Sequence, residues 1–263
     1  MLRRGSGRMT PGSVESYALL LGSAFAAGAV NSVAGGGTLL TFPSLLTVLG
    51  PIGANATSTM ALFPGSLAAG WGFRRELAAS KQHLIRLLPP SLIGGIIGSL
   101  LVIRLPEKVF ASMVPWLLIL ASTLMMLQRP VQRWLGTHSA SKPSSGTVAA
   151  IIFFQFLVGI YGGYFGAGIG ILMLSSLGFM GIGGIHEINA VKNILAAAMN
   201  SMTLIVFAYS GVIVWKYAAI MAVMAIAGGY AGARIARRTK PEYVRTLVIF
   251  IGFAVAAYSW WAK

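Results

Sequence analysis

Residues 31–38 read Asn-Ser-Val-Ala-Gly-Gly-Gly-Thr, and they interrupt an apolar sequence that runs from 17 to 49. Consecutive glycines break a helix because nothing restricts their backbone. The stretch before the glycines (17–34) is long enough to cross a membrane as a helix, whereas the stretch after them (39–49) is too short. A short apolar piece bounded by glycine is typical of a half-helix or re-entrant segment, whose backbone must be covered by protein or line a cavity.

The second half of the chain repeats this plan. A second glycine cluster, Gly-Gly-Tyr-Phe-Gly-Ala-Gly-Ile-Gly at 162–170, comes just before another short apolar piece, 169–180. Four landmarks recur in the same order: Gly28, Asn31 and Gly35 as Gly159, Gly162 and Gly166 (shift 131); Asn55-Ala56 as Asn189-Ala190 and Gly94-Gly95 with Gly98 as Gly228-Gly229 with Gly232 (shift 134); and Pro106-Glu107 as Pro241-Glu242 (shift 135). We therefore predict two homologous halves, 16–127 and 147–262, joined by a linker at 128–146.

The composition is that of a membrane protein. Of 263 residues, 56% are hydrophobic and only 10% charged, against about 25% charged in soluble domains. Such a chain is too apolar to be disordered. The net charge of +15 comes from short basic clusters between long uncharged stretches, as in membrane proteins, and not from a nucleic-acid-binding stripe. Stretches of spanning length run at 17–34, 54–73, 87–103, 109–127, 147–165, 188–209, 217–233 and 246–262.

We predict an all-α polytopic protein of the inner (plasma) membrane, with one transporter domain over 1–263. Its glycine-broken half-helices meet near the midplane, as in transporters built from internal repeats. The distribution of basic residues fits inverted and parallel halves equally well. Parallel halves, however, would have to translocate five basic residues in one short loop, between Arg234 and Arg245. This favours inverted halves.

The residue inventory narrows the chemistry. The chain has no cysteine, no aspartate and five glutamates, and no two of its three histidines have metal-ligand spacing. We therefore expect no metal, no cofactor and no enzyme activity, since most recognisable catalytic sites use these residues. The glycine clusters lack the strand–turn–helix context of a nucleotide-binding loop. The scarcity of acids also argues against a carrier of cations.

The glycine clusters fit an anion site instead. A half-helix that begins inside the membrane has unpaired N–H groups and the positive end of its dipole there. Lys192, within the span 188–209, adds a charge, and its counterpart in the first half is Ser58. The substrate-binding candidates are Asn31, Gly35, Gly36, Gly37, Thr38, Asn55, Ser58, Thr59, Tyr164, Gly166, Gly168, Asn189, Lys192, Asn193 and Asn200.

Several of these residues have a structural alternative. Lys192 can pair with Glu187 or extend to the membrane surface, and Asn55 and Asn189 can cap helices. His186 and Glu187 are candidates for proton coupling, although Glu187 can equally stabilise a helix start. Glycines such as Gly94 and Gly98 suit close helix packing, either within the chain or in a homodimer.

The run 31–43 closely resembles the first-repeat signature of the TauE/SafE family of membrane transporters, the sulfite exporter family. The second-half segments 159–174 and 187–193 resemble that family more loosely, with Gly-Ala-Gly-Ile-Gly where many members carry three consecutive glycines. The resemblance covers about 16–262 and implies transport of sulfite or an organosulfonate. We therefore predict a secondary transporter of small anions, and the alternatives are a different small anion or a non-transporting membrane scaffold.

Overall fold

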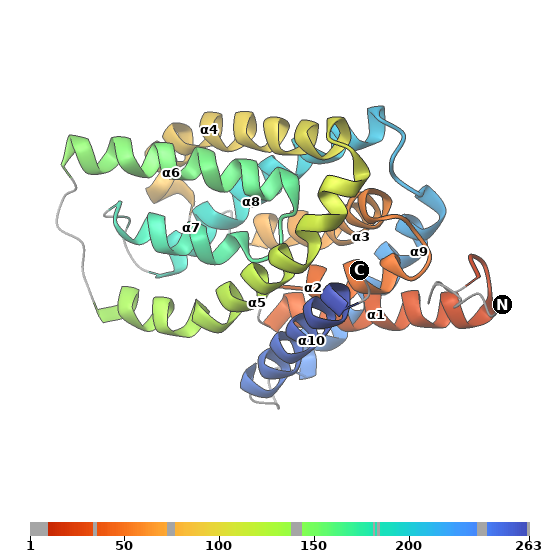
Figure 1. Cartoon of the computed structure of the whole chain (residues 1–263). Helices are drawn as coiled ribbons and strands as arrows, with labels where there is room; N and C mark the ends of the chain where they lie inside the picture. The colour runs from red at the N-terminus through yellow and green to blue at the C-terminus, as the bar shows by residue number, and fades with distance from the viewer. Residues whose placement is uncertain are drawn as a thin grey trace.

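The computed structural model describes residues 10–33, 36–72, 77–137, 144–180, 182, 185–235 and 241–261. These residues form helices and no strand, which confirms the all-α prediction. The helices are α1 (Val14–Val33), α2 (Thr38–Leu46), α3 (Pro51–Gly72), α4 (Leu77–Arg104), α5 (Glu107–Thr137), α6 (Ser145–Tyr164), α7 (Ile169–Gly178), α8 (Ile185–Tyr209), α9 (Trp215–Ile235) and α10 (Pro241–Trp261). Figure 1 shows most of them lying lengthwise beside one another.

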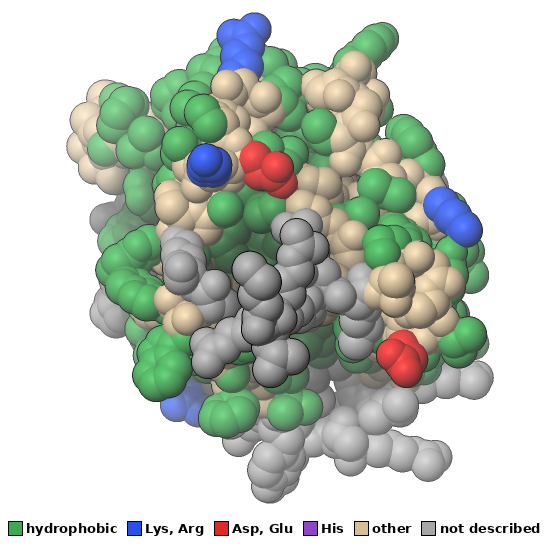
Figure 2. Space-filling model, turned by 45° about the vertical axis from the view of Figure 1, so that its right-hand side comes forward, with side chains coloured by type: hydrophobic (Ala, Val, Ile, Leu, Met, Phe, Trp, Pro, Cys, Tyr) green, Lys and Arg blue, Asp and Glu red, His purple; other side chains and the backbone are tan. Residues whose placement is uncertain are grey.

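The outer surface is that of a multi-pass membrane protein. Segments of α4, α5, α6 and α8 are long and apolar enough to cross a membrane, and the other four predicted spans form α1, α3, α9 and α10. Large apolar side chains such as Phe153, Trp116 and Phe250 are 62%, 60% and 72% exposed. Figure 2 shows one face of the molecule, where hydrophobic side chains are widespread and charges isolated. Such a surface is suited to lipid.

The two short apolar pieces form the predicted half-helices. α2 has 9 residues and α7 has 10, about half of what a membrane crossing needs. Glycines in left-handed conformations come just before each of them, with φ of 87° at Gly36 and 79° at Gly168. L-residues rarely adopt this conformation, so glycine allows the chain to turn at both breaks. The breaks also meet, since the ring of Phe42 in α2 packs edge-on against Phe165, with centroids 5.1 Å apart.

Helices from the two halves pack in pairs. α1 lies parallel to α9, where Tyr17 meets Tyr217 and Gly28 meets the backbone of Ala225. α4 lies parallel to α6 in the same way, because Gln155 Nε2 donates to Ser91 Oγ (2.9 Å) and Gly98 approaches the backbone of Ile160.

Glycines allow close packing in both helix pairs, α1 with α9 and α4 with α6. We call these two contacts the seams. A Cβ on Gly94 would lie 2.5 Å from the carbonyl oxygen of Phe156, and one on Gly98 would collide with that of Ile160. Gly228 approaches Phe25 of α1 in the same way. These glycines therefore serve packing within the chain. The face Gly94-x-x-x-Gly98 is covered by α6 and does not offer the homodimer contact that its spacing suggested.

The order of helices is consistent with a duplication. In each set of five helices, α1 to α5 and α6 to α10, the second helix is the half-helix. The first helix of each set packs against the fourth helix of the other set, α1 against α9 and α6 against α4. In Figure 1, α1 runs away from the end marked N, whereas α6 runs toward that end. The division at 128–146 and the inverted repeat remain our interpretation of these features.

Candidate functional site

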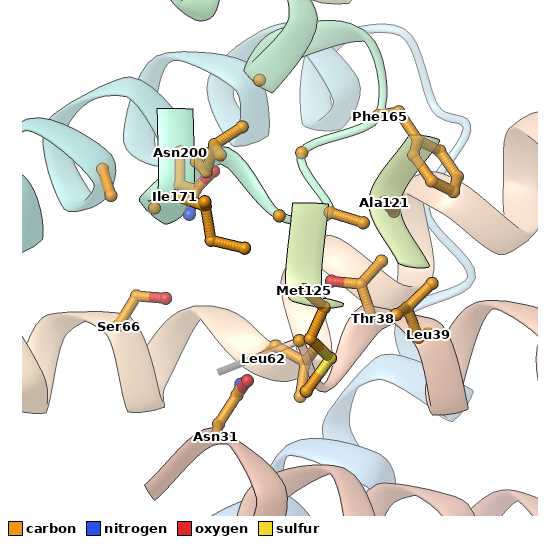
Figure 3. Close-up of a pocket in the computed structure, with 18 of the residues that line it drawn as sticks. Asn31, Thr38, Leu39, Leu62, Ser66, Ala121, Met125, Phe165, Ile171 and Asn200 are labelled. Carbon is orange, nitrogen blue, oxygen red and sulfur yellow. The ribbon is translucent and has the colours of Figure 1, made fainter. Parts of the chain in front are cut away.

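A cavity of about 190 Å³ lies where the two breaks meet. Residues from α1, α2, α3, α5, α6, α7 and α8 line it, together with Gly36 of the first break and residues 165–168 of the second. Figure 3 shows the amide of Asn31 and the hydroxyls of Thr38 and Ser66 directed toward this space from three different helices. The cavity is thus built from both halves of the chain.

The second break contributes backbone to the cavity wall. Gly166, Ala167 and Gly168 line the cavity, and α7 begins at Ile169 immediately afterwards. The cap residues of α7 and α2 are Gly168 and Gly37, which have no side chain to accept from the first amides of these helices. The first amides of a helix have no partners within that helix, so they and the dipole attract negative charge.

Lys192 brings a positive charge to the same place. Its Nζ donates to Asn189 Oδ1 at 2.9 Å, one turn earlier in α8. Its aliphatic chain passes the first turn of α7, since a Cβ on Gly170 would lie 3.5 Å from Lys192 Cδ and 4.0 Å from Nζ. Glu187 forms no ion pair with it, so the predicted pairing is not observed between these described side chains. An ammonium and a helix N-terminus therefore adjoin one cavity.

The other polar groups of the lining are neutral. Thr59, Ser66, Gln128 and Asn200 complete the polar part of the wall, and none of the residues that line the cavity is a carboxylate. Thr59 Oγ1 donates to the carbonyl of Asn55 (2.9 Å) and keeps an acceptor site. The cavity thus combines positive charge with neutral hydrogen-bonding groups.

Eight of the predicted binding residues line this cavity: Asn31, Gly36, Thr38, Thr59, Gly166, Gly168, Lys192 and Asn200. Gly35 lies outside the described residues. Asn189 and Gly37 do not line the cavity, but each is bonded to a residue that does. Asn189 accepts from Lys192, and the N–H of Gly37 donates to Asn31 Oδ1 at 2.8 Å. Asn193 is half-buried on α8 and is not part of the lining.

Three predicted residues are instead buried in structural contacts. Asn55 Nδ2 donates to the carbonyl of Tyr164 (3.0 Å) and ties α3 to the end of α6. Ser58 Oγ pairs with Thr41 Oγ1 at 2.6 Å. The hydroxyl of Tyr164 points to Met113 Sδ (3.2 Å). These contacts direct the three side chains away from the cavity, because each satisfies a polar group in an apolar interior.

The proton-coupling candidates remain predictions. Glu187 lies half-buried in the first turn of α8. The side chain of His186 lies outside the described residues. Glu187 is not among the described residues that line the cavity.

Sequence reasoning missed Ser66 and the contribution of α5, which supplies Ala121, Met125 and Gln128. The repeat contained a signal for Ser66, because adding the shift of 134 gives Asn200, which was predicted. The apolar residues of α5 carried no such signal.

The chain is similar to proteins named as probable membrane transporters over nearly its whole length. Three curated relatives are named probable membrane transporter proteins: one from Haemophilus influenzae, 28% identical over 93% of this chain and 94% of its own; ORF9 from Sinorhizobium sp, 27% identical over 91% and 90%; and YfcA from Escherichia coli K12, 28% identical over 91% and 89%. No solved structure matches the chain. The profile of the family described as Sulfite exporter TauE/SafE matches residues 20–259. This membrane transporter therefore belongs to the TauE/SafE family.

Proposed function

We propose that this transporter moves a small sulfur oxyanion or organosulfonate, such as sulfite, by alternating access around the cavity. The observation that carries the proposal is the position of Lys192, whose chain lies against the first turn of α7 beside a wall without carboxylates. The family description, which names a sulfite exporter, indicates which anions to test first.

The electrostatics favour an anion. The charge of Lys192 and the positive end of α7 act on the same small space, and their repulsion is relieved when an anion binds between them. A desolvated oxyanion also needs several hydrogen-bond donors. Asn31, Thr38, Ser66 and Asn200 can supply such donors from both halves.

The size of the cavity favours a small substrate. Pockets for drug-sized ligands measure about 300–1,000 Å³, whereas this one is about 190 Å³. Sulfite, taurine and sulfoacetate each have few heavy atoms. Alternating access is supported by the placement of the cavity between elements of both halves, since movement of one half against the other would open it to either side.

Uptake into proteoliposomes tests the proposal. We expect saturable uptake of at least one compound among sulfite, taurine, sulfoacetate and sulfate, each of which carries a sulfur oxyanion group, and a loss of more than about 100-fold in transport kcat/KM for Lys192→Met. Lys216→Met is the matched control, because Lys216 is exposed, lies over the Tyr17 ring and is not among the residues that line the cavity.

Two results would contradict the proposal. If the folded wild-type protein moves none of these four compounds, the proposed substrate class is wrong. Uptake that survives Lys192→Met unchanged would remove the proposed charge from the site.

Cysteine labelling tests the inverted arrangement of the halves. The chain has no cysteine of its own, so Lys81→Cys and Lys216→Cys each introduce one unique thiol. We expect a membrane-impermeant maleimide to reach these two positions from opposite sides of the membrane. Labelling from the same side would exclude inverted halves.

A further inference from the structure

The two glycine breaks use their backbone donors differently. In the first break the N–H of Gly37 is occupied, because it donates to Asn31 Oδ1 at 2.8 Å. The shift of 131 places Gly168 at the equivalent position in the second break and Gly162 at the position of Asn31. Glycine has no side chain to accept a hydrogen bond, and the N–H of Gly168 bonds to no other described residue.

A different residue controls the second break. The hydroxyl of Tyr161 donates to the carbonyl oxygen of Ala167 at 2.7 Å. Tyr161 is outside the cavity wall, whereas Ala167 and Gly168 are part of it. The carbonyl of Ala167 is therefore held toward the interior of the protein.

This bond fixes the peptide between Ala167 and Gly168. In a planar trans peptide the C=O and the following N–H point in opposite directions. With the carbonyl of Ala167 bound to Tyr161 behind the wall, the N–H of Gly168 faces the opposite side, where the cavity lies. The glycines at 166 and 168, both with φ of 79°, would otherwise allow this peptide to rotate.

We propose that Tyr161 is a positioning residue for the transported anion: its hydroxyl holds the Ala167–Gly168 peptide so that the N–H of Gly168 donates to the substrate. The inference rests on the proposed function, because it needs an anion in the cavity. It also makes the site asymmetric. The second break supplies a backbone donor, whereas the first break supplies the side-chain amide of Asn31, whose oxygen is already bound and whose Nδ2 is left for the ligand.

The first test is Tyr161→Phe, which removes only the hydroxyl. We expect KM for the transported anion to rise about tenfold, with the maximal rate per folded protein within about twofold of the wild type. Without the Tyr161 hydroxyl, the carbonyl oxygen of Ala167 can turn toward the cavity. This oxygen is a hydrogen-bond acceptor that repels negative charge, so we expect the selectivity between monovalent and divalent anions to change. A purely structural defect would lower the yield or the rate without changing KM.

Tyr164→Phe is the matched control. Its hydroxyl contacts Met113 Sδ, away from the cavity, so its KM is expected to equal that of the wild type. An unchanged KM in Tyr161→Phe, or an equal rise in both variants, would overturn the inference while leaving anion transport established. A wild type that transports none of the four compounds would overturn the proposed function itself.

Hydrogen exchange of the wild-type protein gives a test that needs no variant. With and without a saturating concentration of the anion that is transported, we expect slower exchange in the segment 166–170 and no change in the segment 36–40. Equal protection of both segments, or protection of the first segment alone, would overturn the asymmetry and with it the role of Tyr161.

Discussion

Helices α3 and α8 occupy equivalent places in the two halves, yet they contribute different chemistry. Each follows a half-helix, and the shift of 134 pairs Asn55 with Asn189 and Ser58 with Lys192. In α8 the asparagine accepts from the lysine, which lines the cavity. In α3 the asparagine bonds to the end of α6, and the serine bonds to α2.

The difference teaches that the same order of helices in the two halves of the chain does not require the same binding surface. Among the described residues that line the cavity the charged one is Lys192, so the movement proposed above would carry the charge with α8. In α3, Asn55 ties the first half to α6 of the second half, and Ser58 bonds to α2 within the first half. Variants of α3 and α8 can therefore separate packing from binding.

The largest effect is expected when the lysine is moved between the halves. In the double variant Ser58→Lys with Lys192→Ser, the new ammonium lies in a fully buried place that now holds the Thr41 hydroxyl contact. Burial of an unpaired charge costs about 3 kcal/mol or more. We expect uptake to fall to background and thermal stability in detergent to drop. Transport at half the wild-type rate or more would show that the halves are interchangeable.

We expect the α4–α6 and α1–α9 seams to be equally sensitive to a larger side chain, although the binding residues of the two halves differ. Gly98→Ala in α4 and Gly228→Ala in α9 each place a Cβ against a backbone carbonyl oxygen, of Ile160 and Phe25 respectively. We expect both variants to lose about 2–3 kcal/mol of stability, measured by unfolding in detergent. Gly22→Ala is the control, because a Cβ there meets no atom within 4 Å. A tolerated substitution in one seam only would show that the seams differ.

Substitution of either paired asparagine, Asn55 or Asn189, is expected to have a smaller effect, and the property that changes differs between the two. Asn55→Ala removes the bond to the Tyr164 carbonyl, so stability should fall by about 1–2 kcal/mol with KM unchanged. Asn189→Ala frees the Lys192 ammonium, so KM should change several-fold with less effect on stability. Thermal unfolding and uptake kinetics on both variants check this. The same pattern in both would remove the distinction between α3 and α8.

The smallest effect is expected at Ser66, the counterpart of Asn200. Ser66→Ala removes one neutral hydroxyl from the wall, and we expect KM to rise about two- to threefold. Leu67→Ala is the control, because this neighbouring side chain is 48% exposed on the outside of the protein. A KM identical to that of the wild type would mean that Ser66 does not reach the substrate.

The elements with strong local signals could be predicted from the sequence. The half-helices α2 and α7 are delimited by glycines, and long uncharged stretches define the spans. The face of α3 that meets the cavity could not be predicted, because a polar residue near a break can either bind substrate or make a structural contact. The Thr41–Ser58 and Asn55–Tyr164 contacts decide the rotation of α3, and both depend on neighbours distant in sequence.

The part of the site that comes from α5 had no local signal either. Ala121 and Met125 are ordinary residues of an apolar span, and only the packing of α5 beside α7 brings them to the wall. Tyr161 directly precedes the second glycine cluster in the sequence. Its bond to Ala167, however, depends on the turn made by the glycines.

The exchange of partners between the halves has a consequence for biosynthesis. Gly28 of α1 is complete early, but the helix that packs on it carries Gly228, 200 residues later. At about 5–20 residues per second, the ribosome needs about 10–40 s to supply that partner. During this time α1 lies in the membrane or the insertion machinery, and the face that carries Gly28 does not yet have its partner helix α9. We therefore expect chains that terminate before α9 to be recognised as unassembled and degraded.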